Sequence, residues 1–333
     1  RVVAGLAAEV TVYDAVQPEP PYHLAEECAA LLSERGAQAV IGLGGGSSLD
    51  TAKMAAALAR NPGSVGDYWG LDRLRQKGLP VVAIPTTAGT SSEISAAAVF
   101  VDPAAGAKRG VNSNLLLPTV AIMDPVLTLG LPPALTASTG MDALTHAIEA
   151  YASPKASPVT EGTGERAVAL IAAHLPVAWA RGSDLEARTG MLAGCYFAGL
   201  ALAEVNVGLG HALAQALGGR YPVAHGLANA MFLPRIMRYN RIACRGRYAR
   251  LAGLLGEVTE GLSEDESALL AVEAVERLTV ELGIPQRLRD VGVPREGLAG
   301  VADACLETQT RQLANNPRTV TRADALRVLE EAW

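Results

Sequence analysis

Two short, wholly apolar runs in the first third of the chain constrain its fold more than any other feature. Residues 39–43 and 79–84 hold only aliphatic side chains, proline and glycine, and each run leads into a polar turn. Strands that helices cover on both faces read as continuous apolar runs, and strands that alternate with helices form parallel sheets. The sequence therefore predicts a parallel sheet. Its other predicted elements are strands over 10–13 and 120–123, helices over 23–35 and 48–60, and a helix or turn near Ser91.

The character of the sequence changes after Pro132 and Pro133. Strand-like runs vanish, and alanine- and leucine-rich helical periodicity continues to Trp333. Proline and glycine clusters interrupt this periodicity and predict helix boundaries. The boundaries fall at Ser153-Pro154, Gly218-Gly219, Pro234, 283–285 and 315–317. We therefore predict an α/β domain over residues 1–130 and an all-α domain over residues 131–333.

The first residues read like the middle of a motif. Residues 1–6 resemble the end of a helix, and residues 9–13 resemble a strand that follows it directly. We therefore expect the natural protein to carry residues before Arg1 that complete the sheet and the adenosine pocket. A short native start is the alternative.

The composition narrows the class of protein. The net charge is −6 and no run of basic residues occurs, which argues against a nucleic-acid partner. No apolar run approaches the ~18 residues that a bilayer requires, so no membrane partner is expected. The four cysteines show no C-x-x-C spacing, which indicates reduced thiols and a cytoplasmic protein.

A glycine-rich turn, residues 44–46, joins the first apolar run to the helix that follows it. Glycines let the backbone approach a ligand closely, and free N–H groups at a helix start bind phosphate. The next residues, Ser47 and Ser48, can cap the helix or donate to a phosphate oxygen. The spacing is neither the G-x-G-x-x-G pattern nor the Walker pattern. A tight turn that binds nothing is the alternative.

A second polar turn, residues 85–93, follows the other apolar run. It contains three threonines and two serines at the carboxyl end of a predicted parallel strand, where open α/β sheets bind ligands. Hydroxyl groups suit hydrogen bonds to ribose and diphosphate. A capping box formed by a serine or threonine with Glu93 would explain the same residues and is compatible with ligand binding. Two such turns on neighbouring strands favour a dinucleotide site.

Only five histidines occur, so their placement is informative. Asp142 and His146 lie four residues apart on a predicted helix that starts near Ser138 or Thr139, so both can reach one ion. His211 and His225 follow downstream. One carboxylate with three imidazoles suits Fe(II) or Zn(II) and fits Ca(II) poorly. For the first pair alone, an acidic residue favoured by the helix dipole beside an unrelated histidine is the alternative.

With these motifs together, the chain resembles the iron-containing (group III) alcohol dehydrogenases, and within them the branch of lactaldehyde reductases and propanediol dehydrogenases. The resemblance covers essentially the whole chain. It rests on GGGSSLDTAK (44–53), PTTAGTSSE (85–93), LPPAL (131–135), TGMDALTHAIEAY (139–151), GLGHALAQALGGRYPVAHGLANA (208–230) and NPR (316–318).

The resemblance implies a Rossmann-like α/β domain, an all-α domain and a metal in the cleft between them. The metal ligands that it implies are Asp142, His146, His211 and His225, holding Fe(II), with Zn(II) as the alternative. It implies NAD or NADP as cofactor and a homodimer or larger homo-oligomer. The implied diphosphate contacts are Gly45, Gly46, Ser47, Ser48 and Asp50. The other implied cofactor contacts are Thr86, Thr87 and Thr90 on the nicotinamide half, Lys108, Glu19 on an adenine-side loop, Ser95 and Thr128.

Three departures from the family pattern matter. The family's first strand carries the acidic residue that selects NAD over NADP, and that strand is absent here, so the preference cannot be read. Many members have a histidine four residues after the third metal ligand, where this chain has Gln215. A glutamine can position a substrate but cannot titrate; the alternative is that it satisfies a buried backbone group. The substrate-pocket positions are Ala97, Leu202 and Gln312, which do not favour small diols.

The implied activity is reversible hydride transfer between the nicotinamide and a small alcohol or aldehyde. Maleylacetate reductase and glycerol dehydrogenase are the nearer alternatives, although the spacing of Asp142 and His146 fits neither well. The related lyase 3-dehydroquinate synthase is a more distant one. Its phosphorylated substrate needs clustered lysine and arginine, which are not seen around residues 139–151 or 208–230. A binding protein without catalysis would not be expected to keep four ligands beside two phosphate-type turns.

Overall fold

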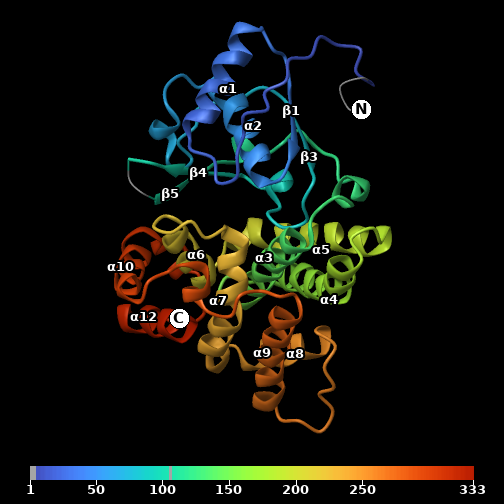
Figure 1. Ribbon diagram of the computed structural model, residues 1–333, viewed down its shortest axis with the longest axis vertical. Helices are drawn as coiled ribbons and strands as arrows, with labels where there is room; N and C mark the ends of the chain where they lie inside the picture. The colour runs from blue at the N-terminus through green and yellow to red at the C-terminus, as the bar shows by residue number, and fades with distance from the viewer. Residues whose placement is uncertain (1–4, 105–106) are drawn as a thin grey trace.

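The chain folds into an α/β part and a helical part that meet along one boundary (Figure 1). The structure is a computed structural model that describes residues 5–104 and 107–333. The strands are β1 (Val40–Gly44), β2 (Gly70–Leu71), β3 (Val81–Pro85), β4 (Ala97–Asp102), β5 (Ala107–Asn112) and β6 (Val120–Ala121). The helices are α1 (His23–Glu34), α2 (Gly46–Leu58), α3 (Pro133–Ala152), α4 (Pro158–Ala180), α5 (Leu185–Val205), α6 (Leu209–Gly218), α7 (His225–Asn240), α8 (Arg245–Leu254), α9 (Glu264–Glu281), α10 (Leu298–Thr308), α11 (Thr310–Leu313) and α12 (Arg322–Ala332).

The predicted parallel sheet is confirmed, with strand order β1-β3-β6. Both apolar runs form strands within two residues of the predicted limits, and Val40 pairs with Val81. Helix α2 lies against one face of β1: a Cβ atom on Gly42 would stand 2.9 Å from the Cβ of Ala52. Helix α1 then packs on α2. The sheet thus places the ends of β1 and β3 side by side, with the two polar turns after them.

The expectation that helices cover both faces of this sheet is wrong for the described residues. Ile41, Leu43 and Val120 are exposed, whereas Val40 and Gly42 are buried under α2. Because successive side chains point to opposite faces of a strand, the exposed set lies on the face away from α2. The apolar run therefore reflects one buried face and one exposed apolar face.

A second sheet was missing from the sequence-based prediction. Its order is β2-β5-β4, and β4 and β5 form an antiparallel pair. Strand β5 reads AKRGVN, without the apolar alternation that marks a strand, so only its pairing with β4 reveals it. Near Ser91 the expected helix or turn is a short 3-10 helix, η3 (Ser92–Ile94).

The strand predicted over residues 10–13 is also wrong. These residues form no strand, and Val12 is 65% exposed. Their β-rich composition finds no neighbouring strand among the described residues, and an unpaired strand has no hydrogen-bond ladder. The helix end expected over residues 1–6 falls largely outside the described residues.

The helical part is built around α3, which packs against α4, α5 and α7. Helix α3 ends at Ala152, before Pro154 as predicted, but it starts at Pro133 rather than near Ser138. Proline fits the first position of a helix because its missing N–H has no partner there. The boundary predicted at Pro234 is wrong as well, since α7 continues through it. There the side chain of Arg235 donates to the carbonyl of Met231, 2.7 Å away.

Two further expectations concern the cysteines and a membrane. All four cysteines are free and buried. No single helix in residues 5–104 and 107–333 is long and apolar enough to cross a bilayer. Helices α5 and α6, which meet at 96°, pass that test as a bent pair by length and composition alone.

Candidate metal centre and cofactor loops

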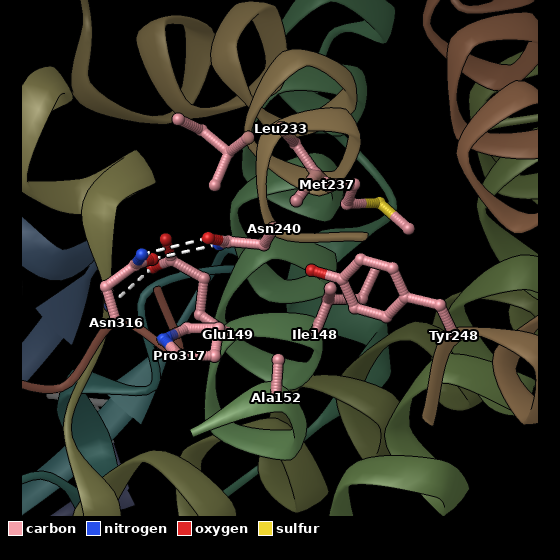
Figure 2. Close-up of a pocket in the computed structure, with 11 residues that line it drawn as sticks. Ile148, Glu149, Ala152, Leu233, Met237, Asn240, Tyr248, Asn316 and Pro317 are labelled. Carbon is pink, nitrogen blue, oxygen red and sulfur yellow. Dashed lines mark hydrogen bonds between the residues drawn. The ribbon is translucent and has the colours of Figure 1, made fainter. Parts of the chain in front are cut away.

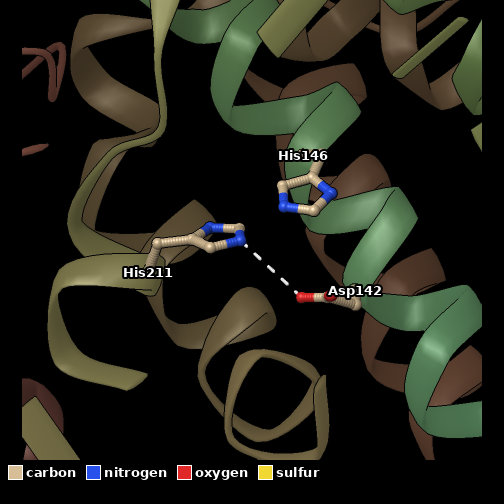
Figure 3. Close-up of side chains that lie close together, drawn as sticks. All are labelled: Asp142, His146 and His211. Carbon is tan, nitrogen blue, oxygen red and sulfur yellow. Dashed lines mark ion pairs between the residues drawn. The ribbon is translucent and has the colours of Figure 1, made fainter. Parts of the chain in front are cut away.

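Three predicted metal ligands converge in the interior of the helical part (Figure 3). Asp142 and His146 lie one turn apart on α3, and His211 reaches them from the first turns of α6. One ligand atom from each residue lies within 4.8 Å of the others. The Nε2 atom of His211 is 3.6 Å from Oδ1 of Asp142. This separation leaves room for a small ion between a carboxylate and two imidazoles.

The fourth predicted ligand, His225, lies beside this group at the start of α7. Its Nε2 atom is 3.9 Å from Oδ1 of Asp142, and its ring centre is 5.3 Å from that of His211. Its side chain is 27% exposed, whereas the other three are buried. The side-chain amide of Asn229 lies between them, 2.6 Å from Asp142 Oδ1 and 3.2 Å from His225 Nε2. His225 therefore forms the open side of the cluster.

An unsatisfied nitrogen atom indicates that the cluster is built for an ion. The Nε2 atom of His211, which faces Asp142 in Figure 3, is buried and has no hydrogen-bond partner among the described residues. Buried polar atoms are rarely left in this state. Imidazole nitrogen with carboxylate oxygen is a donor set that suits Fe(II) or Zn(II). The four residues fit such an ion.

The two polar turns face each other at the carboxyl ends of β1 and β3. A Cβ atom on Gly46 would stand 2.8 Å from the Thr90 side chain, and one on Gly45 would stand 3.3 Å from the side chain of Thr87. The backbone N–H of Thr86 donates to the carbonyl of Gly44, 2.9 Å away. Helix α2 begins at Gly46, so its free N–H groups open at this junction. The following serines, Ser47 and Ser48, lie in its first turn.

Comparisons with known proteins place this architecture in a family. Residues 1–125 match the family model described as "Iron-containing alcohol dehydrogenase", and residues 136–333 match the one described as "Fe-containing alcohol dehydrogenase family, C-terminal". The chain belongs to the iron-containing alcohol dehydrogenases. The recognition made from the motifs is confirmed, and so is the enzyme class, a metal-dependent alcohol dehydrogenase.

Relatives of this iron-containing alcohol dehydrogenase cover nearly the whole chain. It is 43% identical to "Long-chain-alcohol dehydrogenase 1" of Geobacillus thermodenitrificans over 97% of this chain and 82% of the relative. It is 39% identical to the "NAD-dependent methanol dehydrogenase" of Bacillus methanolicus over 99% and 85%. The solved structure of an alcohol dehydrogenase from Oenococcus oeni matches with a TM-score of 0.95 at 36% identity, covering 98% of this chain and 85% of that one.

Burial and neighbouring ionisable groups together set the pKa values of the dehydrogenase's cluster. Burial lowers the pKa of both His146 and His225 to about 4, so both are neutral and ready to bind a metal. For His211 burial acts the same way, but the carboxylates of Asp142 and Glu149 outweigh it and raise the pKa to about 9. The nearby imidazoles also outweigh burial at Asp142 and lower its pKa. Without metal, therefore, His211 carries a proton at neutral pH.

We expect metal affinity to rise with pH, because the ion must displace this proton from His211. Below a pKa of about 9 the imidazole is protonated, so each pH unit upward should tighten binding about tenfold until that pKa is reached. His146 and His225 should add nothing above about pH 5. Competition with a zinc indicator between pH 6 and 8 measures the slope. An affinity that does not change with pH would contradict the protonated state of His211.

Glu149 is a functional candidate that the sequence analysis missed. Its carboxylate accepts a hydrogen bond from Nδ1 of His211 at 2.7 Å, and from the backbone N–H groups of Gly208 and Gly210 at 2.9 and 2.6 Å. A carboxylate behind a metal-binding histidine fixes its tautomer and ring orientation. The available signal was an acidic residue seven positions after Asp142 and three after His146, on the same helix face.

Replacing Glu149 by glutamine should weaken metal binding about 10- to 100-fold, the usual cost of losing a partner behind a ligand. The amide still fills the space, but it cannot hold two backbone N–H groups and the imidazole together as a carboxylate does. The dissociation constant for Zn(II) is the measurement. Glu276→Gln, in an exposed pair with Arg238, is the matched control. Equal affinities in the two variants would remove Glu149 from the metal centre.

Glu149 also lines a small cavity (Figure 2). Its volume is about 10 Å³, close to the lower limit for one water molecule. Asn240 and Asn316 form part of its wall and donate hydrogen bonds to each other at 2.9 Å. Apolar side chains, among them Leu233 and Met237, also line the cavity. The cavity therefore adjoins the residue that binds His211, but it is too small for a substrate.

Several predicted cofactor residues already have partners within the protein. The carboxylate of Asp50 accepts from the Ser92 hydroxyl and the Val99 backbone, and it pairs with the buried Lys53 at 3.0 Å. Ser95 lies beside the same lysine, whose Nζ is 3.5 Å from the Ser95 hydroxyl. This network ties α2 to η3 and β4, so it holds the two turns together. The hydroxyl of Thr128 is buried and donates to the carbonyl of Pro125.

Glu19, which the resemblance places on an adenine-side loop, also has partners within the protein. Its carboxylate forms an ion pair with Lys108 and accepts from the backbone N–H of His225 at 3.2 Å. Glu19 adopts a left-handed backbone conformation, with φ 54°. The loop of Glu19 thus lies next to the metal ligands, on the same side as Lys108. Whether Glu19 touches the cofactor stays a prediction.

Proposed function

We propose that this dehydrogenase transfers a hydride reversibly between NAD(P)(H) and a small alcohol or aldehyde, at a metal held by Asp142, His146, His211 and His225. The single observation that carries the proposal is the buried group of Asp142, His146 and His211, whose ligand atoms lie within 4.8 Å of one another. The family supports Fe(II), with Zn(II) as the alternative.

The metal would act as a Lewis acid that lowers the pKa of the alcohol and stabilises negative charge on its oxygen. The chain supplies the geometry around it. Glu149 orients the His211 ring, and Asn229 spans Asp142 and His225. His225, the most exposed of the four, leaves the approach to the cluster open on its own side.

The cofactor would lie along the two turns, with its diphosphate at the start of α2. Gly45, Gly46, Ser47 and Ser48 offer backbone N–H groups and hydroxyls there, and a helix start favours negative charge. Thr86, Thr87 and Thr90 would follow toward the nicotinamide. Lys108 on β5 pairs with Glu19, which in turn binds the backbone of His225, and its side chain would reach the same half of the cofactor. Asp50 and Ser95 would act through the network that fixes the turns.

A mixed panel of alcohols and aldehydes tests the proposal. Metal-free protein should be reconstituted with Fe(II) or Zn(II) and assayed with NADH and NADPH for reduction, and with NAD and NADP for oxidation. Relatives named for methanol and for long-chain alcohols make chain length the variable to scan. We expect metal-dependent turnover of an aldehyde series, in a homodimer or larger homo-oligomer. Full activity in protein shown by elemental analysis to lack metal would overturn the proposal.

A further inference from the structure

One face of α6 carries Gln215 between the metal cluster and the α/β part. Gln215 lies one turn after His211 and three residues before Gly218. A Cβ atom on Gly218 would stand 3.0 Å from the Nζ atom of Lys108, so this end of the face meets β5. Gln215 is only partly buried, whereas the six residues around it, 211–214 and 216–217, are buried. Gln215 is therefore the accessible residue in a buried stretch of α6 that meets β5 at its end.

A chain of side-chain hydrogen bonds ends at Gln215. It begins at the carbonyl of Ala304 in α10, to which the Thr308 hydroxyl donates at 2.7 Å. The amide of Gln309 donates to that hydroxyl at 3.0 Å, and the amide of Gln312 donates to Gln309 Oε1 at 2.8 Å. The second N–H of the Gln312 amide donates to Gln215 Oε1 at 3.1 Å.

The chain has only one consistent direction, because a hydroxyl has a single proton. Thr308 gives its proton to the Ala304 carbonyl, so toward Gln309 it can only accept. Gln309 must therefore turn its NH₂ group to Thr308 and its oxygen to Gln312. Gln312 then donates from its own NH₂ group to the Gln309 oxygen. The second N–H of that group can therefore donate only to an oxygen atom of Gln215. The reversed arrangement would leave two oxygen atoms 2.7 Å apart without a proton between them.

The free end of the chain is consequently the NH₂ group of Gln215. None of the hydrogen bonds within residues 5–104 and 107–333 involves its Nε2 atom, although its oxygen is occupied by Gln312. Gln215 is thus not satisfying a buried backbone group.

We propose that Thr308, Gln309 and Gln312 are positioning residues that lock the Gln215 amide with its NH₂ group toward the cleft, where it donates a hydrogen bond to the substrate oxygen. The inference rests on the proposed function. A donor stabilises negative charge that develops on this oxygen during hydride transfer, whereas an acceptor would repel it. Gln215 therefore acts by donation and takes no proton, so the alcohol proton must leave by another route.

Reversing the chain tests this role. Gln312→Glu replaces the two N–H donors by acceptors, so Gln215 should flip and turn its oxygen to the cleft. We expect kcat/KM for aldehyde reduction to fall about 10- to 100-fold, more than the ~10-fold expected for Gln215→Met, which loses one hydrogen bond. Gln312→Met, which neither donates nor accepts, should cost less than Gln312→Glu. Metal content should stay unchanged in all three.

A double-mutant cycle separates the flip from the added charge of Glu. In the Gln215→Met background no amide is left to turn, so the part of the Gln312→Glu loss that acts through Gln215 should disappear. An equal loss in both backgrounds would mean that the charge alone acts, and it would overturn the proposal. Thr308→Val, at the exposed end of α10, releases the chain without a charge and should cost about 3-fold. Thr308→Ser keeps the hydroxyl and should cost nothing.

A readout that needs no turnover distinguishes this inference from the proposed function. In protein labelled with ¹⁵N in the glutamine side chains, the Gln215 NH₂ signals are those lost in Gln215→Met. They should exchange rapidly with water in the natural chain, because no protein acceptor holds them, and slowly in Gln312→Glu. Slow exchange in the natural chain would overturn the inference even if the enzyme is active. Rapid exchange in a chain that reduces no aldehyde would leave the orientation of Gln215 correct and the proposed function wrong.

Discussion

Replacing His211 by alanine should empty the metal site and lower kcat more than ~10³-fold, because the reaction loses its Lewis acid. His211 supplies a ligand nitrogen from α6 that no other residue of that helix can replace. The substitution also leaves the buried Glu149 carboxylate without its imidazole partner, although the two backbone N–H groups remain. Metal content by elemental analysis and kcat on the best aldehyde are the two measurements.

His23→Ala is the matched control for this experiment. His23 is an exposed residue at the start of α1, outside the cluster, so its replacement should leave both metal content and rate unchanged. A His211→Ala protein that keeps one metal ion per chain, or that keeps most of its activity, would refute the assignment of the centre.

Replacing Gly46 by valine should raise the dissociation constant of the cofactor strongly and leave metal content alone. A Cβ atom there would stand 2.8 and 2.9 Å from the methyl carbon and hydroxyl oxygen of Thr90, closer than real contacts allow. The second turn must then move away from the start of α2, and the added side chain shields N–H groups that are expected to hold the diphosphate. We expect at least a 100-fold change, about 2.7 kcal/mol.

Gly162→Val provides the comparison, because a Cβ atom at this exposed helical position meets nothing within 4 Å. It introduces the same side chain into a helix of the other part and should not alter cofactor binding. Titration of NADH fluorescence in both variants decides the question. An unchanged dissociation constant in Gly46→Val would show that the diphosphate does not lie against α2.

The limits of several elements could be predicted because they depend on local chemistry. The helix predicted over 23–35 is α1, residues 23–34, and α6 ends where two glycines begin, at Gly218-Gly219. The start of α3 could not be predicted in the same way. Paired prolines mark either a break or a first helical turn, and only the packing of the following residues decides between them.

Pairing between distant segments was the main thing that local patterns could not supply. Strand β5 becomes a strand by pairing with β4 and β2, and residues 10–13 fail to become one because they have no partner among the described residues. The same limit applies to the site. Asp142 and His146 follow from helical spacing, but Glu149 acquires its role from backbone groups 59 and 61 positions away.

The position of Glu19 has a thermodynamic consequence. One carboxylate binds Lys108, which is expected to meet the cofactor, and also the backbone N–H of His225, which is expected to bind the metal. A cofactor that draws Lys108 away changes the partners of Glu19 and thereby the restraint on His225. The free energies of loading cofactor and metal are then not independent, and their coupling is reciprocal. Whatever factor the cofactor imposes on the metal's dissociation constant, the metal imposes on that of the cofactor.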